Sequence, residues 1–498
     1  MSVTTGALFA QQLQYNLDNR ATDSDFDLAA ETEALLNSVG ASTAESSGKL
    51  TFYGQDPIVP SVVRFGAMSA VALAAKAQLI ATIWRERTGH AQDIHVDVRK
   101  ALRRFSPFID RRWETVNGYD GGIYTEPDTP FFSTMYETRD GMWVLPTNFY
   151  PRLHLAAATL LNVPSTVEAV TRAIGNWDGE ALEHAAVEAG VVMPLGRTLQ
   201  QILGMDVFQS GLRDQPLISV VKIADSDPVP FTPDPSDPLS GIRALGLAHV
   251  IAGPSIGRAL ALHGADVLNV WSPEDWEHNV FLYTSHIGSR STMLRIKDAD
   301  ARAKFMDLMA DADIFYANRR PGTLARHGLS AEELCNSHPG LIHATAIYCN
   351  ESGPWSDRVG FDVSTGLTMG LFSLEGSDAR PTPPPISVVN DYFAGWLTTI
   401  GILQALRRRA VEGGSYKVVV SLSRVTLWLM SMGIFDKGYA QATAGSSDAH
   451  TYIDPDVFSA ATPMGIYKGV TEQVEMTETP GRYKFVMEPR GAAQPEWL

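Results

Sequence analysis

The chain has 498 residues, and its 40 Lys and Arg against 56 Asp and Glu give a formal net charge of −16 at pH 7. This length allows two to four domains of roughly 100–200 residues each, and 45% hydrophobic with 19% charged residues is an ordinary globular composition. The acidic balance argues against a nucleic-acid partner and against an anionic membrane surface, because both repel a polyanion.

The N-terminal region predicts a helical arm or a partly disordered segment, followed by a buried helix. The first 50 residues are rich in Ala, Ser, Thr and acidic side chains and show no secretory signal pattern. The apolar stretch Ala67–Trp84 is interrupted by Lys76 and Gln78, whereas a membrane span needs about 20 apolar residues. The two cysteines, Cys335 and Cys349, are too few for a disulfide framework. We therefore expect a cytoplasmic protein.

Two distant segments, Pro60–Ala101 and Pro385–Val425, share one pattern. Each reads as a proline-led loop, a long apolar helix ending in arginines, a glycine turn and an alternating strand. Setting Gly89 against Gly413 aligns the two helices along their length. The pattern indicates an internal repeat with a degenerate first copy, and chance similarity between two helix–turn–strand units is the alternative.

A proline-rich segment, Pro228–Pro238, divides the chain, because proline fixes φ and removes backbone donors. With the repeat, it predicts six segments: an N-terminal arm (1–50), a partial degenerate first Rossmann-like copy (51–130), a small domain (131–227), the linker (228–238), a Rossmann-like domain (239–430) and a C-terminal segment returning over the fold (431–498).

The segment after the linker predicts a doubly wound α/β sheet. Ile242–Leu247 and Ala265–Val270 have strand character, and Pro254 and Gly264 are placed to begin and end a helix between them. Further elements alternate in the same way: Ala301–Asp311 (helix), Ala312–Tyr316 (strand), Ser330–His338 (helix) and Leu341–Tyr348 (strand). The turn after the first strand lacks GxGxxG, so we expect no nicotinamide or flavin cofactor.

Asp391 is the first candidate for chemistry. It lies between a proline-rich loop and the predicted helix Tyr392–Arg409, where an Asp side chain can cap the free N–H groups of the first turn. A carboxylate at that place can also act as a nucleophile. The corresponding place in the N-terminal segment holds Gly66 and Ala67, which carry no acid. Both roles stay open for Asp391.

A second candidate is the arginine-rich stretch Asn318–Ser330, which follows a predicted strand. Arg319, Arg320 and Arg326 should lie at the carboxyl edge of the sheet, where open α/β sheets bind ligands. Guanidinium groups fit phosphate and carboxylate oxygens in pairs. A solvated turn with helix-capping arginines is the alternative.

The third candidate is the loop Cys349–Asp362, whose glycines make a sharp turn after another strand. Its N–H groups could stabilise an oxyanion, although a plain surface loop explains the same pattern. Nothing nearby in sequence activates Cys349 as a nucleophile. No histidine has metal-ligand spacing, so we expect no metal site and treat as structural His263, His278, His286, His327, His338 and His343.

The C-terminal half contains four motifs in order: LSGIRALGLAHVIAGPSIGRALALHGADV, ADIFYANRRPGTLARHGLSAEEL, PGLIHATAIYCNESGPWSDRVGFD and NDYFAGWL with ALRRRAVEGGSYKVVVSL. Together they resemble the family III CoA-transferases, the CaiB/BaiF group, which also contains α-methylacyl-CoA racemases. The resemblance extends from about Leu239 to Met430. A weaker one places Tyr136–Leu153 and Met193–Ile202 in the family's small domain.

The resemblance implies a fold and an architecture. The family combines a Rossmann-like doubly wound domain with a small α+β domain, usually in two interlocked chains. This chain carries parts of both copies, which implies either a homodimer or a single-chain pseudo-dimer.

The resemblance also implies a reaction. In the family's transferases an aspartate attacks the acyl-CoA thioester, and Asp391 matches it. The implied course is a mixed anhydride on Asp391, then an aspartyl-CoA thioester that an acceptor carboxylate attacks. The partners would be an acyl-CoA and a small carboxylic acid, with CoA thioester as substrate and no permanently bound cofactor. The implied site comprises a CoA-binding set (Asn318, Arg319, Arg320, Arg326 and Arg290) and an active-site loop set (Gly353, Phe361 and Asp362).

Several positions depart from the family pattern. Phe361 stands where the racemases have a histidine, which weighs against racemase chemistry. The other departures are Asn269, Trp271, Ser289, Arg295 and the triplet Asn350-Glu351-Ser352. The leading hypothesis is therefore a CoA-transferase. The alternatives are an acyl-CoA racemase, epimerase or isomerase with Asp391 as acid/base, and a repurposed, CoA-independent isomerase or non-catalytic family member.

Overall fold

A seven-stranded sheet organises the C-terminal half of the chain in this computed structural model, which describes residues 6–122, 129–132 and 134–498. The first five residues of the predicted arm and residues 123–128 of the predicted first copy therefore lie outside the described residues. The strand order is β10-β9-β8-β11-β12-β13-β7, and all neighbours are parallel except β7, which is antiparallel to β13. The predicted doubly wound α/β sheet is confirmed. Its strands are β7 (Ser219–Ala224), β8 (Arg243–Leu247), β9 (Asp266–Trp271), β10 (Arg290–Met293), β11 (Ile314–Ala317), β12 (Ile342–Ile347) and β13 (Ser415–Ser421).

The direction of winding reverses between β8 and β11. From β8 the chain adds β9 and β10 on one side, then returns to add β11, β12 and β13 on the other. In open α/β sheets, ligands bind outside the carboxyl ends of the strands at such a reversal. The loops that begin near His249 and Asn318 lie at this place, because they follow β8 and β11 directly.

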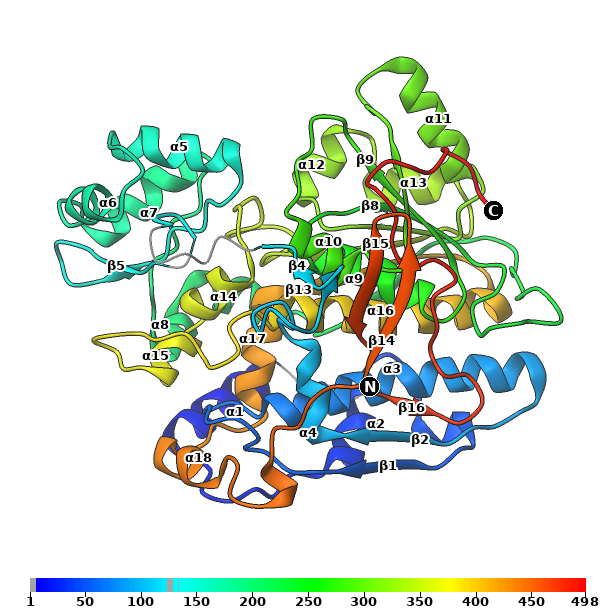
Figure 1. Cartoon of the computed structure of the whole chain (residues 1–498), viewed down its shortest axis with the longest axis horizontal. Helices are drawn as coiled ribbons and strands as arrows, with labels where there is room; N and C mark the ends of the chain where they lie inside the picture. The colour runs from blue at the N-terminus through cyan, green and yellow to red at the C-terminus, as the bar shows by residue number, and fades with distance from the viewer. Residues whose placement is uncertain (1–5, 123–128, 133) are drawn as a thin grey trace.

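Helices cover both faces of the sheet (Figure 1). Successive residues of a strand face opposite sides, so Ala244 packs into the core that contains α9 (Ala252–Ala261) and α16 (Asn390–Glu412), while Leu245 packs with Phe305 of α11 (Ala299–Ala310). The other helices of this half are α10 (Asn279–Ser285), α12 (Pro321–Arg326), α13 (Ala331–Ser337), α14 (Asp362–Thr368), α15 (Leu371–Glu375) and α17 (Leu422–Ser431).

Helix α16 approaches α9 closely one turn after its own start. A Cβ on Gly395 would lie 2.6 Å from the Cβ of Ser255, so a larger residue would push the two helices apart. This contact places the first turn of α16 against the first turn of α9, which itself follows the loop after β8. The start of α16 is thereby held next to the reversal point of the sheet.

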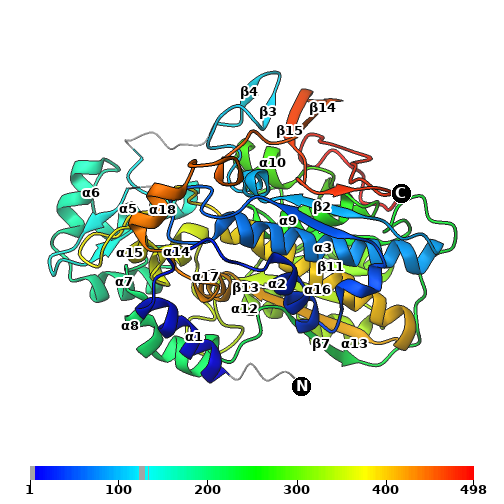
Figure 2. The same cartoon turned by 90° about the horizontal axis from the view of Figure 1, so that it is seen from below.

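The N-terminal unit contains a second, smaller βαβ arrangement. Strands β1 (Leu50–Tyr53) and β2 (Ile94–Asp97) are parallel, and α3 (Phe65–Thr88) connects them and lies alongside α16 (Figures 1 and 2). Both long helices end at a glycine with positive φ, Gly89 at +81° and Gly413 at +63°. The two halves of the suspected repeat therefore fold into the same order of elements. The remaining elements here are α1 (Gly6–Asp18), α2 (Leu28–Ser38), η1 (Thr43–Ser46), α4 (Val98–Ala101), η2 (Leu102–Arg104), β3 (Thr115–Val116) and β4 (Tyr119–Asp120).

Helix α3 contains the apolar stretch that the sequence predicts as buried. In the part of the chain that the structure describes, it is the one helix whose length and composition would suffice to cross a membrane. All residues of its most apolar window are buried inside the protein. It is thus a core helix of this fold.

The small domain has its own core and projects to one side of the sheet (Figure 1). Its apolar side chains, among them Phe131, Leu161 and Leu195, pack with one another. The last part of the predicted segment 131–227 behaves differently, because β7 joins the large sheet as its antiparallel edge. The domain's elements are β5 (Tyr136–Glu137), β6 (Trp143–Val144), α5 (Pro151–Leu161), α6 (Val167–Ile174) and α7 (Gly179–Glu188). The next two elements, α8 (Leu199–Gly204) and η3 (Phe208–Leu212), pack in the large core instead.

The segment after residue 431 runs back across the other units. β15 (Gly465–Val470) pairs with β14 (Val457–Thr462) and β3, and β16 (Glu475–Met476) pairs with β2. The last residues reach the outer edge of the large sheet, where the backbone N–H of Ala493 donates to the carbonyl of Ser291. Two further elements, α18 (Lys437–Thr443) and η4 (Asp448–His450), lie before β14.

A buried cluster of five charged side chains joins these units. Lys76 of α3 pairs with Glu472, which follows β15, and Glu114 lies 3.2 Å from Arg104 and 3.6 Å from Arg258 of α9. All five residues are more than nine-tenths buried. Burial makes each charge depend on its partner, because the protein interior cannot replace the lost hydration.

We expect Glu472→Gln to destabilise the fold by about 3–5 kcal/mol, the usual result of leaving a buried charge unpaired. The ammonium of Lys76 would then be buried near two guanidinium groups with one carboxylate left. Urea unfolding followed by circular dichroism measures the change. Asp178→Asn, which breaks the exposed pair with Arg139, is the control and should cost less than about 1 kcal/mol. Equal unfolding midpoints for Glu472→Gln and the unmodified protein would contradict this account.

Candidate active site

Asp391 lies inside the first turn of α16, where it is 6% exposed. The helix begins at Asn390, and Val389 occupies the capping position. The carboxylate of Asp391 accepts no hydrogen bond from any described residue, so the interpretation of Asp391 as an N-cap is wrong. With Asp391 as the cap the helix would begin at Tyr392, but it begins two residues earlier, at Asn390, and a different carboxylate accepts a backbone N–H of its first turn.

That carboxylate belongs to Asp362. Its Oδ2 accepts the backbone N–H of Asp391 at 2.7 Å, and its Oδ1 accepts the side-chain amide of Asn390 at 3.3 Å. Asn390 is held from its other end by the hydroxyl of Thr426, at 2.9 Å. The structure therefore brings together Asp391 and Asp362, which the sequence assigned to one site from segments 29 residues apart.

The two carboxyl groups disfavour each other's ionisation. Burial raises the pKa of Asp391 well above its ordinary value, and the charge of Asp362 raises it further. Burial also raises the pKa of Asp362, against the hydrogen bonds that it accepts from the backbone at the start of α16. Two like charges in a poorly hydrated site cannot both be stable. The carboxylate of Asp391 is thus basic, and no described residue donates a hydrogen bond to it that would lower its pKa.

The loop between β8 and α9 faces this pair and is held by three side chains. The amide of Asn269 bonds the backbone N–H and C=O of Ala248, and the amide of Asn318 bonds those of His249. The carboxylate of Glu277 accepts the N–H of Val250 at 2.7 Å. Val250 has a φ of +64°, which is strained for a β-branched residue and persists only where the surroundings enforce it.

Glu277 also connects this loop to the small domain. Its Oε1 accepts the hydroxyl of Tyr150, the residue before α5, at 2.7 Å. Burial raises the pKa of Glu277 to about 7. The sequence analysis did not single out Glu277 or Tyr150. The signal available for Glu277 was its place after β9, at the same carboxyl edge as the arginine-rich stretch.

The predicted CoA-binding residues separate into two places. Arg319, Arg320 and Arg326 follow β11 at the carboxyl edge, as their spacing implies. Arg319 pairs with Asp275 at 3.2 Å, Arg320 donates to the carbonyl of Asp357 at 3.0 Å, and Arg326 donates to Thr323 at 2.9 Å. The side-chain amide of Asn318 bonds the backbone of His249, so it holds the loop after β8 in place.

Arg290 lies elsewhere. It is the first residue of β10, and the parallel register places it at the amino edge of the sheet, opposite to Asn318. Its guanidinium is buried and binds Asp266 at 2.9 Å and the carbonyl of Glu496 at 3.0 Å. The expectation that Arg290 joins the other arginines at one site is not met. Arg290 is the first residue of its strand and lies at the amino edge, whereas the other arginines follow a strand and lie at the carboxyl edge.

The loop that carries the remaining predicted residues is tied to the small domain. Arg358 lies 3.3 Å from Glu183 of α7 and covers the ring of Trp355 at 4.0 Å. Gly353 lies at the exposed end of this loop, with φ at +78° and open space where a Cβ would be. Phe361 directly precedes Asp362 and packs against the small domain. Cys349 is buried, and burial raises the pKa of its thiol to about 11, which makes it a poor nucleophile.

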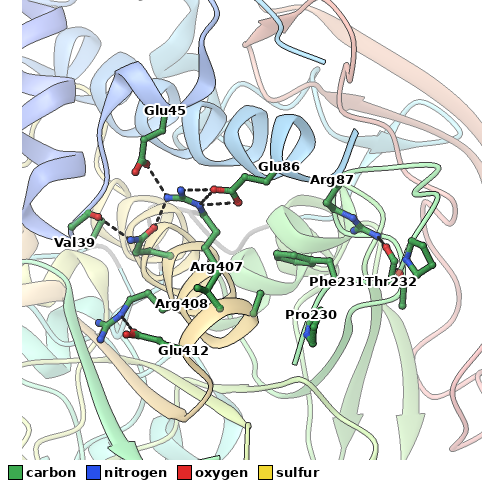
Figure 3. A pocket seen from close by; sticks show the side chains of 15 residues that line it. Val39, Glu45, Glu86, Arg87, Pro230, Phe231, Thr232, Arg407, Arg408 and Glu412 are labelled. Atoms are coloured by element: carbon green, nitrogen blue, oxygen red, sulfur yellow. Dashed lines mark hydrogen bonds and ion pairs between the residues drawn. The ribbon is translucent and has the colours of Figure 1, made fainter. Parts of the chain in front are cut away.

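A separate cavity lies at the other end of α16 (Figure 3). It has a volume of about 820 Å³ and is lined by the ends of α3 and α16 and by the proline-rich linker. Its arginines are already engaged: Arg407 binds Glu45 and Glu86, and Arg408 binds Glu412. More than three helical turns separate the nearest lining residue of α16, Gln404, from Asp391, so this cavity is not part of the same site.

No described group of three or more His, Cys, Asp or Glu side chains could hold a metal ion. The polar side chains described at the switch point include carboxylates, a phenol and guanidinium groups. A basic, unbonded carboxylate next to cationic loops can attack a carbonyl carbon or move a proton.

Comparison with known proteins identifies the family of this region. Residues 239–477 match the model of CoA-transferase family III. The acetyl-coenzyme A transferase nodX of Hypoxylon pulicicidum is 32% identical over 228 residues, which are 43% of this chain and 38% of that protein. The alpha subunit of the succinyl-CoA–L-malate CoA-transferase of Chloroflexus aurantiacus is 30% identical over 242 residues, which cover 44% and 56% of the two chains.

Among solved structures, a CaiB/BaiF family protein from Brucella suis is 27% identical and covers 39% of this chain and 55% of its own, with a TM-score of 0.35. The chain spans between about two fifths and three fifths of the length of these relatives. Residues 239–477 thus form a domain of CoA-transferase family III, and the resemblance noted from the four motifs is confirmed.

Asp391→Asn should stabilise the fold by about 1–2 kcal/mol at pH 8, as is usual when a destabilised active-site group is relieved. Because the pKa of Asp391 is higher in the folded than in the unfolded protein, folding favours the protonated group. Stability is lost as the pH rises from the ordinary value near 4 through the folded pKa. The gain from Asp391→Asn should therefore grow between pH 5 and pH 8.

Thermal unfolding at several pH values measures this gain. Asp307→Asn, which removes an exposed carboxylate within α11, is the control for the loss of one acidic side chain at the surface. A pH-independent difference for Asp391→Asn would show that Asp391 ionises as easily in the folded protein as in the unfolded one.

Proposed function

We propose that the protein transfers CoA from an acyl-CoA thioester to a carboxylic acid through a covalent intermediate on Asp391. The observation that carries the proposal is the buried, unbonded carboxylate of Asp391 in the first turn of α16, beside the reversal point of a family III sheet. The relatives named as acetyl-CoA and succinyl-CoA transferases support the same chemistry.

The reaction balances without any further reactant. A carboxylate oxygen of Asp391 attacks the thioester carbonyl, the C–S bond breaks, and CoA leaves as a thiolate, which gives a mixed anhydride. The thiolate then attacks the aspartyl carbonyl and releases the first acid, leaving an aspartyl-CoA thioester. An acceptor carboxylate and the released thiolate repeat the two steps in reverse, which regenerates Asp391. The covalent route replaces one difficult transfer by several easier steps.

The surroundings of Asp391 suit this role. A raised pKa makes a carboxylate more basic, and a more basic carboxylate is a better nucleophile once it is ionised. The backbone bond to Asp362 fixes the position of Asp391 without using its own oxygens. Arg319, Arg320 and Arg326 lie at the same edge of the sheet and are suited to the phosphates of CoA, because guanidinium groups bind phosphate oxygens bidentately.

The isomerase alternative predicts a different fate for the substrate. An acyl-CoA racemase or isomerase would use Asp391 to remove the proton next to the thioester carbonyl and would leave the C–S bond intact. Incubation in deuterium oxide separates the two: uptake of deuterium at the alpha carbon without exchange of the acid would favour the isomerase. Transfer of CoA to a labelled acid would favour the transferase.

Asp391 should be trapped by hydroxylamine during turnover. Incubation of the protein with acyl-CoA and hydroxylamine should convert the Asp391 side chain to a hydroxamate, because both the anhydride and the thioester react with this amine. Peptide mass spectrometry locates the change, and Asp391→Ala should abolish both labelling and CoA transfer. A protein that still transfers CoA with Asp391 unlabelled would refute the covalent intermediate. Asp307→Asn serves as the control and should be labelled like the unmodified protein.

Asp362→Asn should shift the pH dependence of CoA transfer. The amide oxygen of Asn can still accept the N–H of Asp391, but its side chain carries no negative charge. The pKa of Asp391 should therefore fall, and the acidic limb of the profile of kcat/KM should move to lower pH. An unchanged acidic limb would show that Asp362 does not influence the ionisation of Asp391.

A further inference from the structure

A cluster of aromatic rings from two domains lies beside Asp391. Phe149 and Tyr150 come from the small domain, His278 and Phe281 from the start of α10, and Phe361 from the loop before α14. The ring centroid of Phe149 lies 4.8 Å from that of Phe361, 4.9 Å from that of Tyr150 and 5.9 Å from that of Phe281. The rings of Tyr150 and Phe361 are nearly parallel, with 17° between their planes.

Two hydrogen bonds and one electrostatic interaction connect this cluster to the first turn of α16. Phe361 directly precedes Asp362, whose carboxylate accepts the N–H of Asp391. Thr284, one turn after Phe281, shares a hydrogen bond of 2.8 Å with the hydroxyl of Tyr392. The charge of Asp391 contributes, after burial and Glu277, to the raised pKa of Tyr150, so its phenol lies within electrostatic range.

The cluster is not a sealed core. Phe281 and His278 are more than nine-tenths buried, whereas Phe149, Tyr150 and Phe361 are each partly exposed. Partly exposed rings that converge on a reactive group are typical of the apolar part of a ligand pocket. An aromatic ring of a ligand can stack on such side chains or meet them edge to face.

The charges around the cluster select against a second carboxylate. Asp391, Asp362 and Glu277 are all acidic, and no described cation contributes to the pKa shift of Asp391. Arg319, whose charge acts on Tyr150 and Glu277, is already paired with Asp275. Burial lowers the pKa of His278 to about 4 and that of His249 well below its ordinary value, so both rings are neutral at pH 7.

We propose that this cluster is the acyl subsite, and that it takes an uncharged acyl group that carries an aromatic ring rather than an acyl group with a second carboxylate. The proposal rests on the proposed function, because it treats Asp391 as the nucleophile that the thioester carbonyl must reach. The ring of the acyl group packs against the exposed parts of Phe149, Tyr150 and Phe361, and the CoA moiety extends toward the arginines after β11.

A panel of three thioesters tests the acyl class. Phenylacetyl-CoA carries an uncharged ring, succinyl-CoA carries a second carboxylate, and acetyl-CoA is a small neutral reference. We expect kcat/KM, measured by CoA transfer to a labelled acceptor acid, to be at least about tenfold higher for phenylacetyl-CoA than for succinyl-CoA. A higher value for succinyl-CoA would overturn the proposal.

Variants of the cluster test the location. Phe361→Ala removes one wall, and Phe149→Leu keeps an apolar side chain but removes the ring, which guards against a loss caused by misfolding. Each should lower the ratio of kcat/KM for phenylacetyl-CoA to that for acetyl-CoA by about tenfold. Phe458→Ala, which removes a ring that belongs to a different aromatic pair, with Tyr467, is the matched control and should leave this ratio unchanged. An unchanged ratio in both cluster variants would overturn the location.

Binding separates this proposal from the proposed function. On the Asp391→Ala protein, calorimetry should show tighter binding of phenylacetyl-CoA than of succinyl-CoA, whether or not any chemistry takes place. If no thioester labels Asp391 but this preference is present, the transferase mechanism fails and the acyl subsite stands. If Asp391 is labelled but the preference is absent, the subsite fails and the mechanism stands.

Discussion

The hydrogen bond from the backbone of Asp391 to the carboxylate of Asp362 is the contact on which the site depends. It makes one acid the anchor of α16 and leaves the other acid free. Both groups are buried, so the anchor also raises the pKa of the residue that it positions. Position and reactivity are thereby linked through a single short contact between two segments of the sheet's carboxyl edge.

The N-terminal unit contains a counterpart of this contact. Oδ2 of Asp56 accepts the backbone N–H of Ala67 in the first turn of α3, at 2.5 Å, and its Oδ1 accepts that of Gly66. When Gly89 is set against Gly413, Ala67 aligns with Asp391. The first copy thus retains a buried carboxylate at the start of its long helix and has a methyl group where the second copy has an acid. This arrangement leaves α3 with a packing role beside α16.

One departure from the family pattern, Asn269, serves the packing of the switch-point loop together with Asn318 and Glu277. Asn269 and Asn318 each hold one residue of the loop after β8 by both backbone groups, and Glu277 holds the next. Asn269 lies in β9, Glu277 follows β9, and Asn318 follows β11, so segments of two strands hold one loop. Together they maintain Val250 in a strained conformation, which indicates that the shape of this loop matters to the site.

From the order of its residues alone, the chain specifies the alternation of strands and helices, the long buried helices and the place of Asp391. Those features are local: hydrophobic periodicity, prolines and glycines determine them within short stretches. The grouping of Arg319, Arg320 and Arg326 after β11 is local in the same way. For these residues the position along a strand already implies the edge of the sheet at which they lie.

The tertiary structure determines the other features of the site, because these features depend on pairs of residues that are far apart in the chain. Asp362, and not Asp391, accepts the backbone N–H at the start of α16. Arg290 lies away from the other arginines because its strand begins at the opposite edge of the sheet. Strand β7 pairs with the large sheet and not with the small domain. Glu277 and Tyr150 form their hydrogen bond only because the small domain packs against the segment that follows β9. Burial, and with it every raised pKa at this site, is a property of that assembly and is not written in any one segment.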